Sequence, residues 1–309
     1  MITQTIEKNL TKKIRLLQSQ IGQTPLVRMP EPFSTDKVSI YAKLEWQQLG
    51  HSVKARAAYQ IFKDALFNGL LDRNKTLLDA SSGNTAIAYA AIGAHLGIRV
   101  HICLPENASQ KRKSLLKILG AEVTYTDPFE GTDGAQEAAA RLAEAYPDRF
   151  YYADQYNNPS NRKAHYLTTG PEIMWQLQKI THFICGLGTT GSFSGTSEYL
   201  AEVKPSVERI QVQPNSALHG LEGWKHMPTA KVPGIFRKDL AEQALSVDTV
   251  EALDVLKDVA RHTGMLISPS SAANLKSAMQ LAQTLEHGHI VTLFPDDLMK
   301  YDEILNQVI

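Results

Sequence analysis

The sequence predicts an α/β protein in which helices cover parallel sheets, and three observations support that prediction. Short apolar runs alternate along the chain with segments of helical periodicity, which is the order that parallel sheets require. Both halves of the chain contain runs of each kind, which indicates two domains. A length of 309 residues gives each domain enough chain for a core of its own.

The elements follow from the spacing of apolar residues, at helical intervals for helices and in short uninterrupted runs for strands. In the first half, the predicted helices are 55–71, 85–96, 109–119 and 134–145, and the predicted strands are 76–80, 100–104, 121–125 and 150–152. In the second half, the predicted helices are 171–178, with Pro171 at its start, 191–203, 250–262 and 271–286, and the predicted strands are 182–185, 209–213 and 289–294. The aperiodic stretch 215–240 predicts a long functional loop.

Composition excludes several classes of protein. Hydrophobic residues make up 43% and charged residues 21%, which is typical of a globular protein and excludes a disordered, collagen-like or coiled-coil chain. Lys plus Arg and Asp plus Glu both number 32, so a general nucleic-acid binder is disfavoured. Cys103 and Cys185 end apolar runs, which favours buried thiols over a disulfide framework or a metal site. No secretory or membrane-spanning segment is visible, so we expect a cytoplasmic protein.

A glycine-rich loop, Gly186-Leu-Gly-Thr-Thr-Gly191, follows a predicted strand and opens a predicted helix. Bare backbone N–H groups at a helix start attract phosphate. A dinucleotide site would also need an acidic residue at the end of the next strand, but that strand ends in Gln213. The hydroxyls of Thr189, Thr190 and Ser192 favour a phosphate monoester, with a purely structural turn as the alternative.

Two further segments carry possible chemistry. The loop Ser81-Ser-Gly-Asn-Thr85 suits a carboxylate, although a helix cap has the same residues. Lys54 stands where a helix begins, which lowers the pKa of an ammonium and favours a Schiff base, whereas most lysines are simply solvated. These features together call for a small cofactor with a phosphate and a carbonyl that reacts with lysine, and for a substrate with a carboxylate. Pyridoxal phosphate meets all three requirements.

Eight motifs in a fixed order reveal a family resemblance over about residues 15–305. They are Ile21-Gly-Gln-Thr-Pro-Leu-Val, Ser52-Val-Lys, Ser82-Gly-Asn-Thr, Gly120-Ala-Glu, Gln155-Tyr-Asn-Asn-Pro, Thr169-Gly-Pro-Glu-Ile, Gly188-Thr-Thr-Gly and Ser270-Ser. The chain thus resembles the cysteine synthase (O-acetylserine sulfhydrylase) family of fold-type II pyridoxal-phosphate enzymes. The segments Ile180-Thr-His-Phe and Val232-Pro-Gly-Ile-Phe resemble the B-type enzymes in particular.

The resemblance implies a two-domain fold like that of the tryptophan synthase β subunit, with the active site in the cleft. Residues 1–23 and 45–156 would form the N-terminal domain, which carries the Schiff-base lysine and the carboxylate loop. Residues 24–44 and 157–309 would form the C-terminal domain, which carries the phosphate loop. A cytoplasmic homodimer is expected, with the tail of serine acetyltransferase as a candidate partner and no metal, membrane or nucleic acid.

The implied function is a transferase reaction of cysteine biosynthesis. An O-activated serine such as O-acetylserine would undergo β-replacement by a sulfur nucleophile, through an aminoacrylate, to give L-cysteine. A cystathionine β-synthase-like or lanthionine-forming activity, and a weakly catalytic regulatory or assembly protein that binds pyridoxal phosphate, stay open as alternatives.

The resemblance also assigns roles to individual residues. Lys54 would form the internal aldimine and move the Cα proton, and Ser270 would face the pyridine nitrogen. Asn84 would bind the cofactor 3′-oxygen. The phosphate would be held by Gly188, Thr189, Thr190, Gly191 and Ser192. The substrate carboxylate would be held by Ser81, Ser82, Gly83, Thr85 and Gln155.

The sequence departs from the family pattern at several of these motifs. His51 and Ala55 replace the usual glycine and aspartate around Ser-Val-Lys, so His51 is a candidate proton-transfer group or gate, or a tolerated surface substitution. Ala272 replaces a glycine near the ring site. Glu222 stands where thiosulfate-using enzymes often carry arginines, which disfavours a dianionic sulfur donor unless Lys225 compensates.

Overall fold

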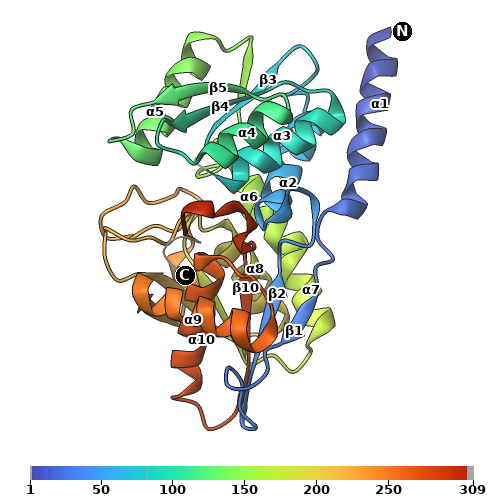
Figure 1. Ribbon diagram of the computed structural model, residues 1–309. Coiled ribbons are helices and arrows are strands. Elements are labelled where there is room, and N and C mark those ends of the chain that lie inside the picture. The colour runs from blue at the N-terminus through green and yellow to red at the C-terminus, as the bar shows by residue number, and fades with distance from the viewer. Residues whose placement is uncertain (1, 82, 305–309) are drawn as a thin grey trace. The chain divides into compact units, whose positions relative to one another are not determined.

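The structure, a computed structural model, describes residues 2–81 and 83–304. Contacts divide the chain into two compact units (Figure 1). The first unit contains Met1–Gly22 and Lys54–Asn161, and the second contains Gln23–Val53 and Arg162–Ile309. Each unit has its own sheet, as the alternation of apolar runs predicted.

The first unit is built on a four-stranded parallel sheet in the order β5-β4-β3-β6. Its strands are β3 (Thr76–Ala80), β4 (Val100–Pro105), β5 (Glu122–Thr126) and β6 (Phe150–Tyr152). Its helices are α1 (Ile2–Leu17), α2 (Lys54–Phe67), α3 (Asn84–Leu96), α4 (Gln110–Ile118) and α5 (Gly131–Ala145). Right-handed crossovers place α3 and α4 on one face and α5 on the other, so every residue of β3 is buried (Figure 1).

The second unit is built on a six-stranded sheet in the order β1-β2-β10-β7-β8-β9, parallel except for β1. Its strands are β1 (Leu26–Arg28), β2 (Val38–Leu44), β7 (His182–Gly186), β8 (Glu208–Pro214), β9 (Gln243–Val247) and β10 (Gly288–Phe294). Its helices are α7 (Thr169–Gln176), α8 (Gly191–Val203), α9 (Thr249–Thr263) and α10 (Pro269–Ala282), and α6 (Pro159–Leu167) crosses the boundary in sequence.

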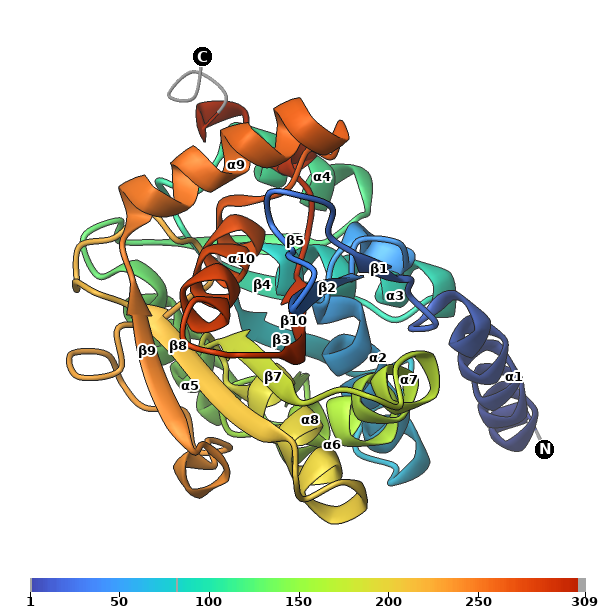
Figure 2. The same cartoon turned by 90° about the horizontal axis from the view of Figure 1, so that it is seen from below.

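Alternation along β7 divides the core of the second unit into two layers. Phe183 and Cys185 pack with residues of α7 and α8, whereas Ile184 packs with residues of α9 and α10 (Figure 2). Cys103 and Cys185 are both buried, and neither takes part in a disulfide with a described residue, as the sequence predicted. Among the described residues, no helix is long and apolar enough to cross a membrane.

Several sequence predictions need correction. Pro171 is the third residue of α7, which begins at Thr169, and the helices predicted at 55–71 and 271–286 end at Phe67 and Ala282. Five elements had not been predicted, namely α1, β1, β2, α6 and β9. The β9 strand is largely exposed, so it lacks the apolar run that marks a buried strand.

The contact division also differs from the predicted domain limits at Gln23 and at 157–161, and the largest difference covers residues 45–53, which it groups with the second unit. The reason is local hydrogen bonding to the segment that follows β10. The N–H of Glu45 donates to the carbonyl of Phe294 at 3.0 Å, and the N–H of Val53 donates to that of Pro295 at 2.8 Å. The functional roles of the two domains stay a prediction.

Candidate active site

The predicted carboxylate loop joins β3 to α3, and part of it serves as a helix cap. The Ser81 hydroxyl accepts hydrogen bonds from the N–H of Gly83 at 3.2 Å and of Ala86 at 3.3 Å. It thereby satisfies one of the donors that a helix start leaves unpaired. Asn84 is the first residue of α3 and is half-buried, and Ser82 lies outside the described residues.

Gln155 joins this loop from a distant part of the chain. The Thr85 hydroxyl donates to Gln155 Oε1 at 2.7 Å, and Gln155 Nε2 donates to the carbonyl of Ala80 at 2.8 Å. Both side chains are buried. Since the hydroxyl proton of Thr85 is used, the second amide N–H of Gln155 and the backbone N–H groups at the start of α3 are the better donors for a carboxylate.

The predicted phosphate loop lies between the end of β7 and the start of α8. Thr189 and Thr190 are buried, and Thr190 has a left-handed φ of 69° immediately before the helix. Its hydroxyl is buried and has no hydrogen-bond partner in the part of the chain that the structure describes. The Ser192 hydroxyl lies 3.2 Å from His165 Nε2, and the other ring nitrogen of His165 lies 2.8 Å from the Thr169 hydroxyl. The sequence analysis missed the buried His165.

The glycines of this loop are required by what lies beneath them. A Cβ on Gly188 would stand 2.0 Å from the carbonyl oxygen of Gly223, and one on Gly186 would stand 1.9 Å from the Trp224 ring. The N–H of Lys225 also donates to the carbonyl of Leu187 at 2.8 Å. The loop predicted at 215–240 therefore supports the phosphate loop, a contact that no local pattern signals.

Ser270 lies in the first turn of α10, within a chain of hydroxyl groups. Its Oγ lies 3.0 Å from that of Ser268, which caps the helix, and 3.5 Å from Asp296 Oδ1. Tyr301 OH donates to Asp296 Oδ2 at 2.6 Å. Asp296 is fully buried and is a second group that the sequence analysis missed.

Lys54 is half-buried. Because it is the first residue of α2, it stands at the positive end of the helix dipole. The turn that precedes it is left-handed at Gly50 and His51, with φ values of 75° and 51°. The buried Lys300 donates to the His51 carbonyl at 2.7 Å. Ala55 and Ala272, two departures from the family pattern, are fully buried.

The left-handed φ of His51 is a backbone conformation that glycine adopts without strain. We expect His51→Gly to raise the free energy of unfolding by about 0.5–1 kcal/mol, because glycine removes the cost of a left-handed residue. The His51 ring is exposed and makes no hydrogen bond to a described residue, so the pH–rate profile should not change. Thermal unfolding and initial rates from pH 6 to 9 check both points. His51→Ala is the control, since it removes the ring but keeps the strain; an altered profile in both variants would restore a proton-transfer role.

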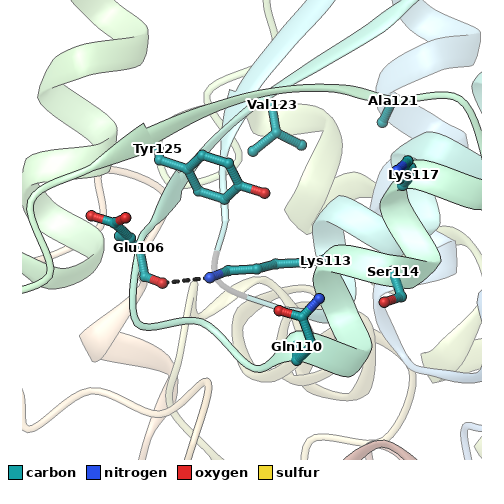
Figure 3. Close-up of a pocket in the computed structure, with 8 residues that line it drawn as sticks. All are labelled: Glu106, Gln110, Lys113, Ser114, Lys117, Ala121, Val123 and Tyr125. Carbon is teal, nitrogen blue, oxygen red and sulfur yellow. Dashed lines mark hydrogen bonds between the residues drawn. The ribbon is translucent and has the colours of Figure 1, made fainter.

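A pocket of about 580 Å³ lies elsewhere, between α4 and β5 (Figure 3). Within it, Lys113 Nζ donates to the carbonyl of Glu106 at 2.6 Å and lies 5.1 Å from the centre of the Tyr125 ring. None of the predicted site residues lines this pocket.

The four predicted site segments share one property that suits pyridoxal phosphate. Lys54, Asn84, Gly191 and Ser270 each stand in the first turn of a helix, where backbone N–H groups and the helix dipole favour anions. The Thr190 hydroxyl, which has no hydrogen-bond partner among residues 2–81 and 83–304, and the bare glycines fit a phosphate in particular. The residues present therefore fit the cofactor.

Comparison with known proteins agrees with this chemistry. A family model described as "Pyridoxal-phosphate dependent enzyme" matches residues 17–296. The chain is 43% identical over 290 residues to cysteine synthase of Aquifex aeolicus, covering 91% of this chain and 88% of that one. It is 34% identical over 283 residues to cysteine synthase B of Salmonella typhimurium, covering 91% and 92%.

Solved structures include close matches of the same fold. An O-acetylserine dependent cystathionine beta-synthase from Helicobacter pylori is 30% identical, with a TM-score of 0.86 over 93% of this chain and 96% of that one. A cysteine synthase from Entamoeba histolytica is 28% identical, with a TM-score of 0.86 over 92% and 88%. The protein is a fold-type II pyridoxal-phosphate enzyme. Within that class, the chain belongs to the cysteine synthase family.

Proposed function

We propose that the protein converts O-acetylserine and a sulfur nucleophile into L-cysteine, with pyridoxal phosphate as its cofactor. The observation that carries this proposal is the 43% identity to a cysteine synthase over nearly the whole chain. The presence of Lys54, the 81–85 loop, the 186–191 loop and Ser270 at helix starts supports it. The reaction is a β-replacement, in which acetate leaves the β-carbon and sulfur takes its place.

Each group would have a distinct task. When bound, pyridoxal phosphate supplies an electron sink for the amino-acid substrate. The hydroxyls of Thr189, Thr190 and Ser192 and the N–H groups at the start of α8 would hold its phosphate. Ser270 would present a hydroxyl to the pyridine nitrogen, and Asn84 would hydrogen-bond the 3′-oxygen.

The amino-acid substrate would be bound and deprotonated by groups from two segments. The 81–85 loop and Gln155 would bind its carboxylate, with the N–H groups at the start of α3 and the second amide N–H of Gln155 as donors. Lys54 would take the proton from the substrate Cα as general base and return a proton at the end of the reaction. Its place at a helix start favours the neutral amine that this task needs.

Purified enzyme loaded with pyridoxal phosphate should form cysteine from O-acetylserine and sulfide, as measured by acid ninhydrin. Without sulfide, O-acetylserine should change the visible spectrum, because elimination of acetate precedes sulfur addition. Neither cysteine nor a spectral change with O-acetylserine would overturn the proposal.

Cystathionine synthesis is the second candidate. The similarity to the Helicobacter pylori enzyme favours it, as does Glu222, which lies next to the Gly223 carbonyl under the phosphate loop. A carboxylate there would repel thiosulfate but tolerate the ammonium of a zwitterionic thiol. Comparing kcat/KM for sulfide, thiosulfate and homocysteine separates the candidates.

The assembly of the enzyme completes the proposal. We infer a cytoplasmic homodimer, with the C-terminal tail of serine acetyltransferase as a candidate partner, on the family resemblance of the sequence. Sedimentation equilibrium tests the dimer, and competition between a tail peptide and O-acetylserine tests the partner.

A further inference from the structure

A buried carboxylate stands directly behind the loop assigned to the substrate carboxylate. Asp79 is the fourth residue of β3 and is 1% exposed. Its Oδ1 accepts from the N–H of Ala80 at 2.9 Å, and its Oδ2 accepts from the N–H of Gln155 at 3.3 Å. Tyr89, on α3, is fully buried, and its hydroxyl lies close enough to respond to the charge of the same carboxyl group.

Through Gln155, this carboxylate is linked to the predicted substrate site. The main-chain N–H of Gln155 bonds to Asp79, while its main-chain carbonyl accepts from Asn161 Nδ2 at 2.7 Å. Its side chain bonds to Ala80 and Thr85. These four contacts fix Gln155. A change in the charge of Asp79 would therefore reach, through Gln155, both Ala80 before the 81–85 loop and Thr85 at its end.

We propose that Asp79 is a positioning residue that couples binding of the substrate carboxylate to uptake of a proton. The inference rests on the proposed function. It says that the protonation of Asp79 controls the affinity of the predicted site for its substrate. Ionised Asp79 holds the main chain of Gln155 but places a buried negative charge one hydrogen bond away from the site for an anionic substrate group. Neutral Asp79 removes that repulsion. Binding of the substrate carboxylate therefore favours the protonated form of Asp79.

The surroundings of Asp79 support a change of charge near neutrality. Burial raises the pKa of Asp79 to about 7, against the lowering effect of its hydrogen bonds. The titratable groups that act on it or respond to its charge are Tyr89, Cys103, Tyr151, Tyr152, Asp154 and Tyr156. Burial raises the pKa of the Cys103 thiol to about 11 and raises the pKa of each of the four phenols. The thiol and the phenols therefore stay neutral where Asp79 titrates.

The test compares the pH dependence of KM for O-acetylserine, at saturating sulfide, in wild type and Asp79→Asn. In wild type, KM should rise from pH 6 to pH 8 by about three- to tenfold, since a shift of one pKa unit on binding changes affinity at most tenfold. Asparagine is neutral at both values, so the KM of Asp79→Asn should vary much less. The kcat profiles of the two proteins should have the same shape. Asp72→Asn removes an exposed carboxylate of the same unit that accepts from the N–H groups of Asn74 and Lys75, and it should keep the wild-type KM profile.

A second measurement does not depend on catalysis. Addition of L-serine to wild-type enzyme in weakly buffered solution at pH 7, followed with a pH indicator, should take up more protons than the same addition to Asp79→Asn. An active wild type whose KM is constant from pH 6 to 8 would overturn the role of Asp79 and leave the proposed function intact. Absence of cysteine formation would instead overturn the proposed function. Equal proton uptake by wild type and Asp79→Asn would reject the coupling of Asp79 protonation to substrate binding.

Discussion

Replacing Lys54 with alanine is expected to lower kcat for cysteine formation by at least ~10³-fold, because it removes both the amine that would bind the cofactor and the base at the substrate Cα. The fold should survive, since the change takes a cation away from the positive end of α2. The measurements are initial rates with O-acetylserine and sulfide, together with thermal unfolding.

A direct chemical readout accompanies the rates. Borohydride reduction of the loaded wild-type enzyme, followed by peptide mass spectrometry, should place the pyridoxyl group on Lys54. Lys63→Ala is the matched control, because Lys63 lies on the same helix and stacks on the Tyr59 ring, 5.7 Å from its centre. Labelling of a different lysine, or an unchanged rate in Lys54→Ala, would contradict the assignment.

Replacing Gly188 with alanine is expected to reduce affinity for pyridoxal phosphate by about 10- to 100-fold, which corresponds to about 1.4–2.8 kcal/mol. The new Cβ would stand 2.0 Å from the Gly223 carbonyl oxygen. Since that obstacle is main chain, the phosphate loop itself has to shift, with a loss of stability of about 1–3 kcal/mol. Equilibrium dialysis of the apoprotein and thermal unfolding measure the two effects.

A neighbouring glycine provides the control for Gly188. A Cβ on Gly186 meets the side chain of Trp224, so Trp224→Leu should partly restore cofactor binding to Gly186→Ala. The same second change should not restore Gly188→Ala, whose clash is with a carbonyl group. Rescue of both variants, or wild-type affinity in Gly188→Ala, would show that the packing of 223–224 against this loop does not control cofactor binding.

Four of the strands that the sequence predicted, β3, β4, β7 and β10, are mostly buried and mostly apolar. The β2 strand is equally buried but contains Lys43, which reads as a surface residue. The Lys43 ammonium is paired with Glu172 at 2.8 Å and donates to the Thr24 carbonyl at 2.9 Å, partners that only the fold provides.

The candidate site divides in the same way. The loops 81–85 and 186–191 and the position of Lys54 are encoded locally, because small residues and hydroxyls before a helix produce an anion site through short-range backbone geometry. The supporting groups Asp79, His165 and Asp296 gave no such signal. A buried polar side chain is recognised by its partners, and Asp79 meets Gln155 across 76 residues of chain.

The sequence by itself determined the fold class and the cofactor chemistry, and it predicted the loops that would face the ligands, because periodicity and helix starts act over a few residues. Only the tertiary structure decided what holds those loops in place. Gly223 lies under Gly188, and Lys300 holds the His51 carbonyl before Lys54. These contacts join residues far apart in sequence, and their geometry exists only once the second unit has folded around its six-stranded sheet.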